Sequence, residues 1–174
     1  ELGEYTFVLL NDLNRWMTRL KLPFDEASLM ELTIVVALWV SRNGGELLTL
    51  EPVADALAHF SNSTSDTNRL EELYVVYDKI ISAVATGIRQ DLEKINPGRP
   101  WRVLNMNRAI VATRCHKTDL MESSFESLIK WFPDDTADFF RNGMGQMNAL
   151  DYPDQVRTVM GKYYSRCTVK PSMH

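Results

Sequence analysis

The sequence predicts an all-α fold, a single-domain bundle of seven or eight helices that occupies residues 1–174. Apolar residues recur at intervals of three and four along most of the chain, which is the period of amphipathic helices. Prolines and glycines divide these stretches into helix-sized segments, and no pair of strand-like segments is present to form a sheet. The 174 residues have the size of one domain. Their composition, 45% hydrophobic and 24% charged, excludes disordered and collagen-like chains.

The first predicted helix occupies residues 5–21. Its apolar positions follow intervals of four, three and four, with polar residues between them: Leu9, Leu13, Trp16 and Leu20. That spacing is typical of an amphipathic helix at the surface of a domain. Pro23 ends the helix, because proline cannot continue a helix and disfavours helical angles at the residue before it.

The second predicted helix begins after Asp25, a suitable N-cap, and ends at Gly44 and Gly45. Within it, residues 29–40 are apolar on almost every face. A short helix of this kind usually lies at the centre of a bundle, and we expect it there. Many of residues 33–40 are β-branched, so a buried strand is the alternative for that segment.

Two further helices are predicted before the middle of the chain. The first is short, begins at Pro52 and runs to Phe60. The second is the longest periodic stretch, residues 67–95, and we expect it to be the spine of the domain. Its apolar stripe is formed by Leu70, Leu73, Tyr77, Ile80, Val84, Ile88, Leu92 and Ile95. For this stripe, a seam within the core is favoured over a helix–helix dimer contact.

Residues 97–100, Pro-Gly-Arg-Pro, form the clearest interruption of the chain and separate two charge regimes. Residues 1–98 carry 8 basic and 15 acidic side chains, a net charge of −7. Residues 99–174 carry 11 basic and 8 acidic side chains, a net charge of +3. Because either half alone would bury only a thin core, we interpret residues 96–100 as a hinge within one domain.

After this hinge the predicted helices are shorter and end at prolines. One covers residues 102–113, and the next covers residues 118–132 with a capping box at residues 123–126. The apolar stripe of the latter consists of Met121, Phe125, Leu128 and Phe132. Two later helix starts, at Pro133 and Pro153, share an aromatic residue before the proline and an acidic residue after it. Their similarity suggests that the C-terminal half stacks in the manner of an α-solenoid.

Residues 99–117 form a basic segment that contains no acidic residue. Guanidinium groups match the paired oxygens of phosphates and carboxylates, and a tryptophan adds a surface for stacking. The residues that would bind an anion or an acidic partner are Arg99, Trp101, Arg102, Arg108, Arg114 and Lys117. The alternative is an internal role, in which the segment pairs with the acidic half of the same chain. The charge asymmetry favours this internal role.

The remaining motifs carry weak chemical signals. Cys115 and His116 are adjacent, but neighbours on a helix point about 100° apart, so a buried structural cysteine is favoured over a nucleophile. Residues 143–145, Gly-Met-Gly, follow a helical segment instead of a strand and are interpreted as a site of close helix packing. No metal-ligand spacing joins the histidines. The sequence therefore predicts no catalytic residue, no metal ligand and no cofactor.

Two cysteines do not make a disulfide framework, and two reduced thiols in a cytoplasmic protein are expected. The longest apolar run, residues 34–40, is far shorter than the roughly 20 residues that span a bilayer. We therefore expect a soluble protein without a membrane partner.

Three hypotheses for function follow. The first is a non-catalytic helical protein-interaction module, an adaptor or structural subunit that binds a protein partner or itself. Its basis is the number of helix seams, the eight methionines and four tryptophans, and the absence of an assembled catalytic constellation. The second, ranked lower, is an RNA- or anion-binding protein that uses residues 99–117. The third is an enzyme whose site is assembled from dispersed residues.

Overall fold

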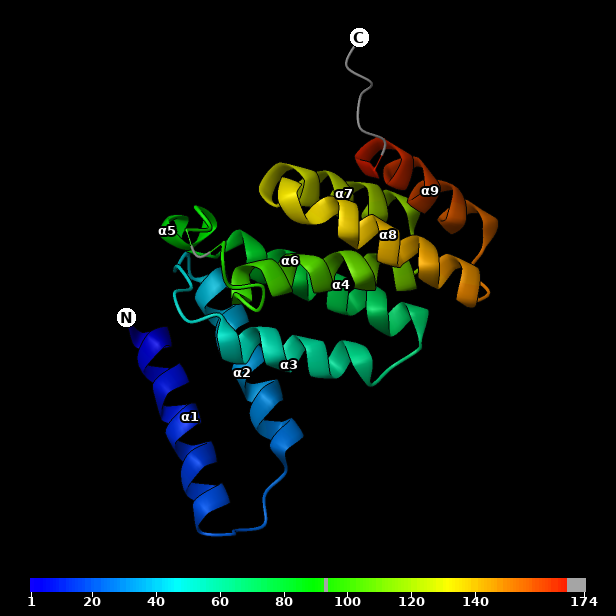
Figure 1. The fold of residues 1–174 in the computed structure, drawn as a ribbon. Helices are drawn as coiled ribbons and strands as arrows, with labels where there is room; N and C mark the ends of the chain where they lie inside the picture. Colours follow the sequence, from blue (N-terminus) through cyan, green and yellow to red (C-terminus); the bar gives the residue numbers. More distant parts are fainter. Residues whose placement is uncertain (93, 169–174) are drawn as a thin grey trace. The chain divides into compact units, whose positions relative to one another are not determined.

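The structure is a computed structural model that describes residues 1–92 and 94–168, and it confirms the all-α prediction. Within these residues the chain forms nine helices and no β-strand (Figure 1). The helices are α1 (Leu2–Arg19), α2 (Glu26–Arg42), α3 (Glu51–Asn62), α4 (Thr67–Ser82), α5 (Thr86–Arg89), α6 (Pro100–Arg114), α7 (Thr118–Trp131), α8 (Pro133–Ala149) and α9 (Asp154–Thr168). The expected number of seven or eight becomes nine because the stretch 67–95 contains two helices.

The described residues divide into two compact units. The first unit comprises residues 1–64 and 72–104, and the second comprises residues 65–71 and the described residues from 105 onward. Helices α4 and α6 each contribute residues to both units. The hinge expected at residues 96–100 lies within the first unit and stays a prediction.

In the first unit, α1 and α2 form an antiparallel hairpin, and α2 also packs against α3 (Figure 1). The predicted N-cap of α2 is confirmed, since a carboxylate oxygen of Asp25 accepts a hydrogen bond from the backbone N–H of Ala27 at 3.1 Å. The predicted end of α2 is confirmed as well. Gly44 takes a φ of 68°, the left-handed conformation that favours glycine, and the N–H of Gly45 donates to the carbonyl of Val40.

The expected central position of α2 is wrong. Only Thr33, Ala37 and Val40 of this helix are buried, while Val35 and Trp39 are 53% and 46% exposed. Because α2 is helical throughout, the alternative of a buried strand is excluded. The apolar composition of this helix therefore does not mean that it is covered on all sides.

The expected long helix over residues 67–95 is also wrong in its length. Helix α4 ends at Ser82, because the next residues leave the helix to bond with another segment. The N–H of Leu47 donates to the carbonyl of Ala83 at 2.8 Å, and the N–H of Ala85 donates to the carbonyl of Leu47 at 3.0 Å. These two bonds form an isolated parallel bridge between Leu47 and Val84, and a bridge requires extended backbone.

The interior of the first unit is built largely from α3, from the predicted stripe of α4 and from the bridge that follows α4. Side chains with almost no exposed surface are Leu47, Val53, Leu57, Tyr77, Ile80 and Val84. The stripe of α4 is thus a seam within the core, as favoured from the sequence. The last members of the predicted stripe, Leu92 and Ile95, lie beyond the helices and are exposed.

In the second unit, α7, α8 and α9 contact one another pairwise and form a three-helix bundle. The predicted stripe of α7 is confirmed as buried, and Phe125 lies at its centre. Its ring meets Phe140 and Tyr163 edge-on, with ring centroids 5.0 Å and 5.1 Å apart. Such edge-to-face pairs add about 0.5–1.5 kcal/mol beyond the burial of area.

The expected capping box at residues 123–126 is wrong, because these residues lie in the middle of α7. Glu126 instead binds α9, where its carboxylate accepts hydrogen bonds from Arg166 and from the hydroxyl of Tyr163. The bond from Arg166, followed by that from Tyr163, lowers the pKa of Glu126 below its usual value. The glutamate therefore joins two helices instead of capping one.

Candidate functional site

The basic segment 99–117 is the first candidate, and the structure distributes its residues over both units. Arg99, Trp101 and Arg102 belong to the first unit, whereas Arg108, Arg114 and Lys117 belong to the second. Each unit therefore holds three of the six residues.

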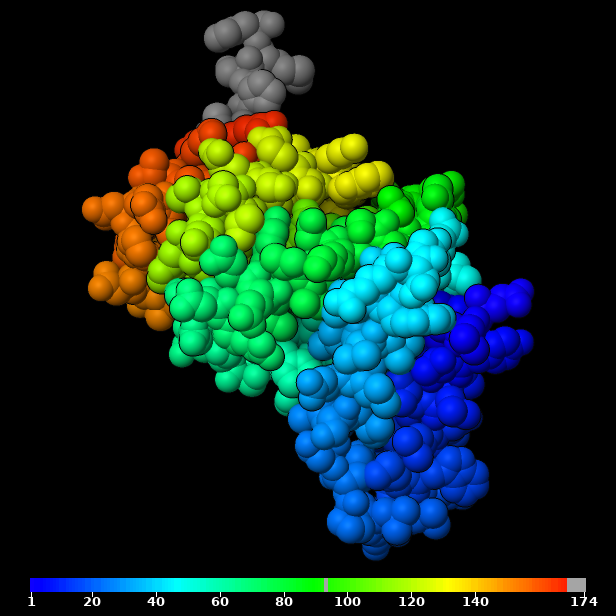
Figure 2. Space-filling model, turned by 180° about the vertical axis from the view of Figure 1, so that it is seen from behind, coloured from blue at the N-terminus to red at the C-terminus, as the bar shows by residue number. Residues whose placement is uncertain are grey.

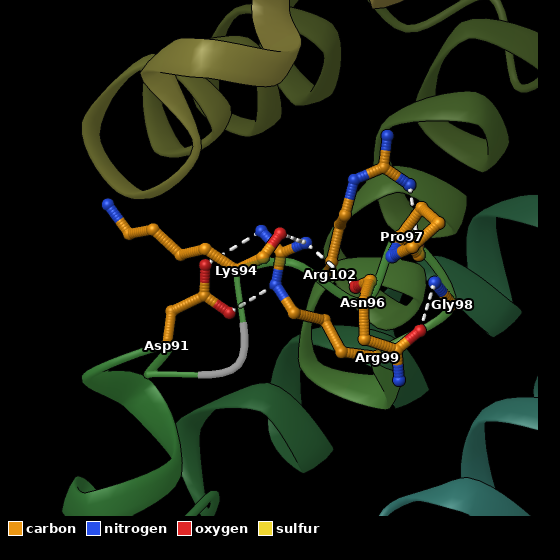
Figure 3. A network of polar contacts seen from close by, with 7 residues as sticks. All are labelled: Asp91, Lys94, Asn96, Pro97, Gly98, Arg99 and Arg102. Atoms are coloured by element: carbon orange, nitrogen blue, oxygen red, sulfur yellow. Dashed lines mark hydrogen bonds and ion pairs between the residues drawn. The ribbon is translucent and has the colours of Figure 1, made fainter.

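The guanidinium of Arg99 binds residues of the loop that precedes it (Figure 3). Its Nε and Nη2 atoms donate to the two carboxylate oxygens of Asp91 at 2.5 Å and 2.8 Å, and both side chains are only 6% exposed. Its Nη1 atom donates to the carbonyl oxygens of Lys94 and Asn96. This bidentate pair and the two carbonyl contacts occupy the donors that an anion would need.

Trp101 and Arg102, the next two candidate residues, also make contacts within the chain: Trp101 is buried and Arg102 binds a backbone carbonyl. Trp101 is only 3% exposed, so its indole ring presents too little surface for a base to stack on. The Nη1 atom of Arg102 donates to the carbonyl of Pro97 at 3.0 Å (Figure 3).

In the second unit, Arg108 is buried, Arg114 is half-buried and Lys117 is exposed. The Nζ atom of Lys117 lies 3.3 Å from a carboxylate oxygen of Glu71. Glu71 and Asp91 both come from the acidic part of the chain, residues 1–98. The Arg99–Asp91 and Lys117–Glu71 ion pairs thus join the basic segment to the acidic part of the same chain.

Cys115 and His116 do not form a catalytic pair in the second unit. The thiol of Cys115 is 3% exposed, and burial, followed by the charge of Glu71, raises its pKa to about 11. The thiol is therefore protonated at neutral pH and is a poor nucleophile. His116 takes a φ of 60° at the turn before α7, and its ring packs edge-on against Tyr152 instead.

The described part of the first unit contains three grooves, two of which are lined by more than one element. One, of about 490 Å³, is bounded by α1, α2 and α3 and carries Glu26, Glu51 and Asp55 at its walls. The other, of about 460 Å³, is lined by Trp101 and by the Arg99–Asp91 pair, whose charges satisfy each other. Over residues 1–92 and 94–168, no three His, Cys, Asp or Glu side chains lie together as a group that could hold a metal ion. Neither groove offers an evident catalytic constellation.

The most unusual surface of the first unit is the outer side of the α1–α2 hairpin. On α1, a stripe of large apolar side chains runs along the whole helix and faces solvent: Leu2, Tyr5, Leu9, Leu13, Trp16 and, just after the helix, Leu20. Leu9 is 71% exposed and Trp16 is 59% exposed. Helix α1 contacts α2 through a different side, where Gly3 and Phe7 are buried.

Helix α2 contributes a second stripe, formed by Leu32, Val35 and Trp39. At 3.6 residues per turn, residues nine apart in a helix point in opposite directions, so Trp39 lies opposite Met30, which lines the groove toward α3. Residues two apart also point nearly opposite ways, so Leu13 of α1 lies opposite Asn11, which lines the same groove. Both stripes therefore lie on the side of the hairpin away from α3.

We name these nine residues of α1 and α2 the hairpin face. Seen from behind, the surfaces of α1 and α2 lie side by side in blue without another element over them (Figure 2). The nine side chains are between 44% and 73% exposed. They present on the order of 1,000 Å² of apolar surface, since a large apolar side chain has roughly 150–250 Å² to bury. The largest apolar patch of a typical monomer is only about 300–600 Å².

Sequence reasoning identified the stripe of α1 but not its exposure. The signal was present, because the intervals of four, three and four were visible at Leu9, Leu13, Trp16 and Leu20. Periodicity shows that a helix has an apolar side, but it does not show whether that side is covered.

Comparisons of the chain with protein-family models, with curated proteins and with solved structures found no match. No helix within the described residues is both long enough and apolar enough to cross a membrane. The hairpin face is accordingly the candidate functional surface that the geometry of this chain offers.

Proposed function

We propose that this chain is a non-catalytic helical protein-interaction module that binds a helical partner through the hairpin face. The supporting observation is the exposure of nine large apolar side chains on one side of two packed helices. Burying one such side chain stabilises a protein or a complex by about 1.5–3 kcal/mol. A partner that covers the hairpin face therefore gains a large apolar contact.

The composition of the hairpin face suits protein recognition. Tyr5, Trp16 and Trp39 are aromatic residues of the kind that is enriched in interfaces and in energetic hot spots. Two antiparallel helices with apolar stripes on one side present ridges with grooves between them, and the side chains of another helix pack into these grooves. An amphipathic helix is therefore the complementary partner surface.

Photo-cross-linking in the cells that produce this protein tests the proposal. The photo-reactive amino acid p-benzoylphenylalanine is placed at Trp16 on the hairpin face or, as a control, at Thr18, which is exposed on the opposite side of α1. We expect a discrete covalent adduct from position 16 and none from position 18. The adduct should also be lost when Leu9→Lys and Leu13→Lys are added.

Two results would contradict the proposal. The first is the absence of any adduct from position 16. The second is an adduct that forms equally from both positions, because such cross-linking would report random collision instead of a defined surface.

A further inference from the structure

We infer that the partner of the hairpin face is a second copy of this chain, which forms a two-fold symmetric dimer with α1 antiparallel to α1 of the other copy. This inference rests on the proposed interaction function and names its partner. The observations that carry it are the area of the hairpin face, the spacing of its stripe and the distribution of charge along α1.

The area of the hairpin face matches what a stable dimer needs. A standard protein–protein interface buries about 800 Å² on each partner, and the hairpin face offers on the order of 1,000 Å². In a two-fold dimer the same surface is used by both copies, so apolar area on one copy meets equal apolar area on the other. Two antiparallel hairpins that pack in this way form a four-helix arrangement, which is a common way to bury helix stripes.

The stripe of α1 has nearly the same spacing in both directions. Its intervals are three, four, four, three and four from Leu2 to Leu20. When two copies run antiparallel with their centres aligned near residue 11, Leu2 lies opposite Leu20 of the second copy, and Leu9 lies opposite Leu13. Leucine side chains then face one another at the ends and at the centre of the helix, and Tyr5 lies within one residue of the position opposite Trp16 of the second copy.

The charges of α1 favour the antiparallel orientation over the parallel one. Glu1 lies at the start of the helix and Arg19 and Lys21 lie at its end, whereas the carboxylate of Glu4 is bound within its own chain by Leu48 and Thr49. Antiparallel copies bring the acidic end of one helix to the basic end of the other, and their helix dipoles oppose each other. Parallel copies would place like charges side by side at both ends.

Sedimentation equilibrium of the purified chain tests the dimer. We measure concentrations from about 1 to 100 µM, because interfaces of standard size range from micromolar to much tighter affinity. The expected mass is twice the 20.0 kDa of one chain. The double variant Leu13→Lys and Trp16→Lys should lose at least half of the dimer with an unchanged far-ultraviolet circular dichroism spectrum. The matched variant Asn11→Lys and Thr18→Lys, on the other side of α1, should remain dimeric.

Cysteine cross-linking tests the orientation. In a Cys167→Ser background, the double variant Leu2→Cys and Leu20→Cys should form disulfide-linked dimers, and neither single variant should do so. Cys115 is buried and does not compete. Disulfides that form in each single variant would show parallel helices and overturn the antiparallel arrangement.

The outcomes separate this inference from the proposed function. A purified chain that is monomeric at every concentration overturns the dimer. If position 16 nevertheless gives an adduct with a different protein in cells, the interaction function stands with another partner. If no adduct forms either, both are overturned.

Discussion

The role of Arg99 in the structure differs from one of the roles that its sequence context suggests. In the sequence it opens a basic segment, for which anion binding and pairing with the acidic half of the chain are both possible and the internal role is favoured. In the structure its charge is buried against Asp91 in a bidentate pair, and the remaining donors bind backbone carbonyls of the same loop. Arg99 therefore connects Asp91 with the backbone of Lys94 and Asn96, a role that depends on a partner eight positions earlier in the chain.

The Arg99–Asp91 pair leads us to predict that Asp91→Asn destabilises the protein. Asparagine has nearly the same size and tolerates the φ of 52° at this position, so the change removes the charge without straining the backbone. Because the change removes the charge of the carboxylate that binds this buried guanidinium with both oxygens, we expect a loss of about 3–5 kcal/mol in the free energy of unfolding, measured by urea titration.

The control for this prediction is Asp12→Asn in the same unit. Asp12 pairs with Arg15 at the surface, where the two side chains are 50% and 74% exposed. An exposed pair of this kind contributes less than about 1 kcal/mol. Equal losses of unfolding free energy in the two variants would show that the buried pair stabilises the protein no more than the exposed pair does.

At the scale of the helix, the two glycines of α8 differ although they are only two residues apart. A methyl group on Gly143 would lie 2.6 Å from the sulfur of Met160 in α9, whereas a methyl group on Gly145 would meet nothing within 4 Å. The close packing expected at residues 143–145 is thus a property of Gly143 alone. The absence of a side chain at Gly143 leaves room for the side chain of Met160, and no backbone atom of α9 comes this close.

The two alanine variants should therefore change the free energy of unfolding differently. Gly145→Ala should raise the free energy of unfolding by about 1 kcal/mol, because alanine has the higher helix propensity. Gly143→Ala gains the same propensity but displaces Met160, and overpacking of this kind costs roughly 1–3 kcal/mol, so no net gain is expected. Thermal melts of both variants check this, and equal stabilisation would mean that Met160 moves away freely.

At the scale of the whole molecule, opposite charges are separated along the chain, with −7 on residues 1–98 and +3 on residues 99–174. This separation favours pairing within the chain, whereas the basic segment 99–117 on its own suggests binding to a polyanion. It also makes the internal role testable, because burial and ion pairs within the chain predict a loss of stability where an exposed anion site predicts a loss of binding.

The triple variant Arg102→Gln, Arg108→Gln and Arg114→Gln distinguishes these two roles. We expect it to lower the free energy of unfolding by a few kcal/mol, since these side chains are buried or half-buried, and to leave heparin binding unchanged. A control changes three exposed cations to glutamine, namely Arg42, Lys130 and Arg141, and should retain its stability. An unchanged melting temperature with lost heparin binding would instead favour the nucleic-acid hypothesis.

Much of the fold follows from local chemistry that a sequence displays directly. Four features depend on residues within a few positions of one another: the cap at Asp25, the left-handed glycine at Gly44, the proline at the start of α8 and the apolar periodicity of α7. Intervals of three and four residues identify helices because the backbone period is 3.6. The all-α class, and most helix boundaries, are consequently determined by the sequence itself.

Only the tertiary structure decided which apolar surfaces are covered and which charges are paired. The end of α4 depends on a bridge to Leu47, the burial of Arg99 depends on Asp91, and the exposure of the hairpin face depends on α3 packing on one side only. The stripes of α1 and α7 have similar spacing, yet one faces solvent and the other lies in the core. The physical reason is that hydrophobic patterning is a property of one helix, whereas burial is a property of its neighbours.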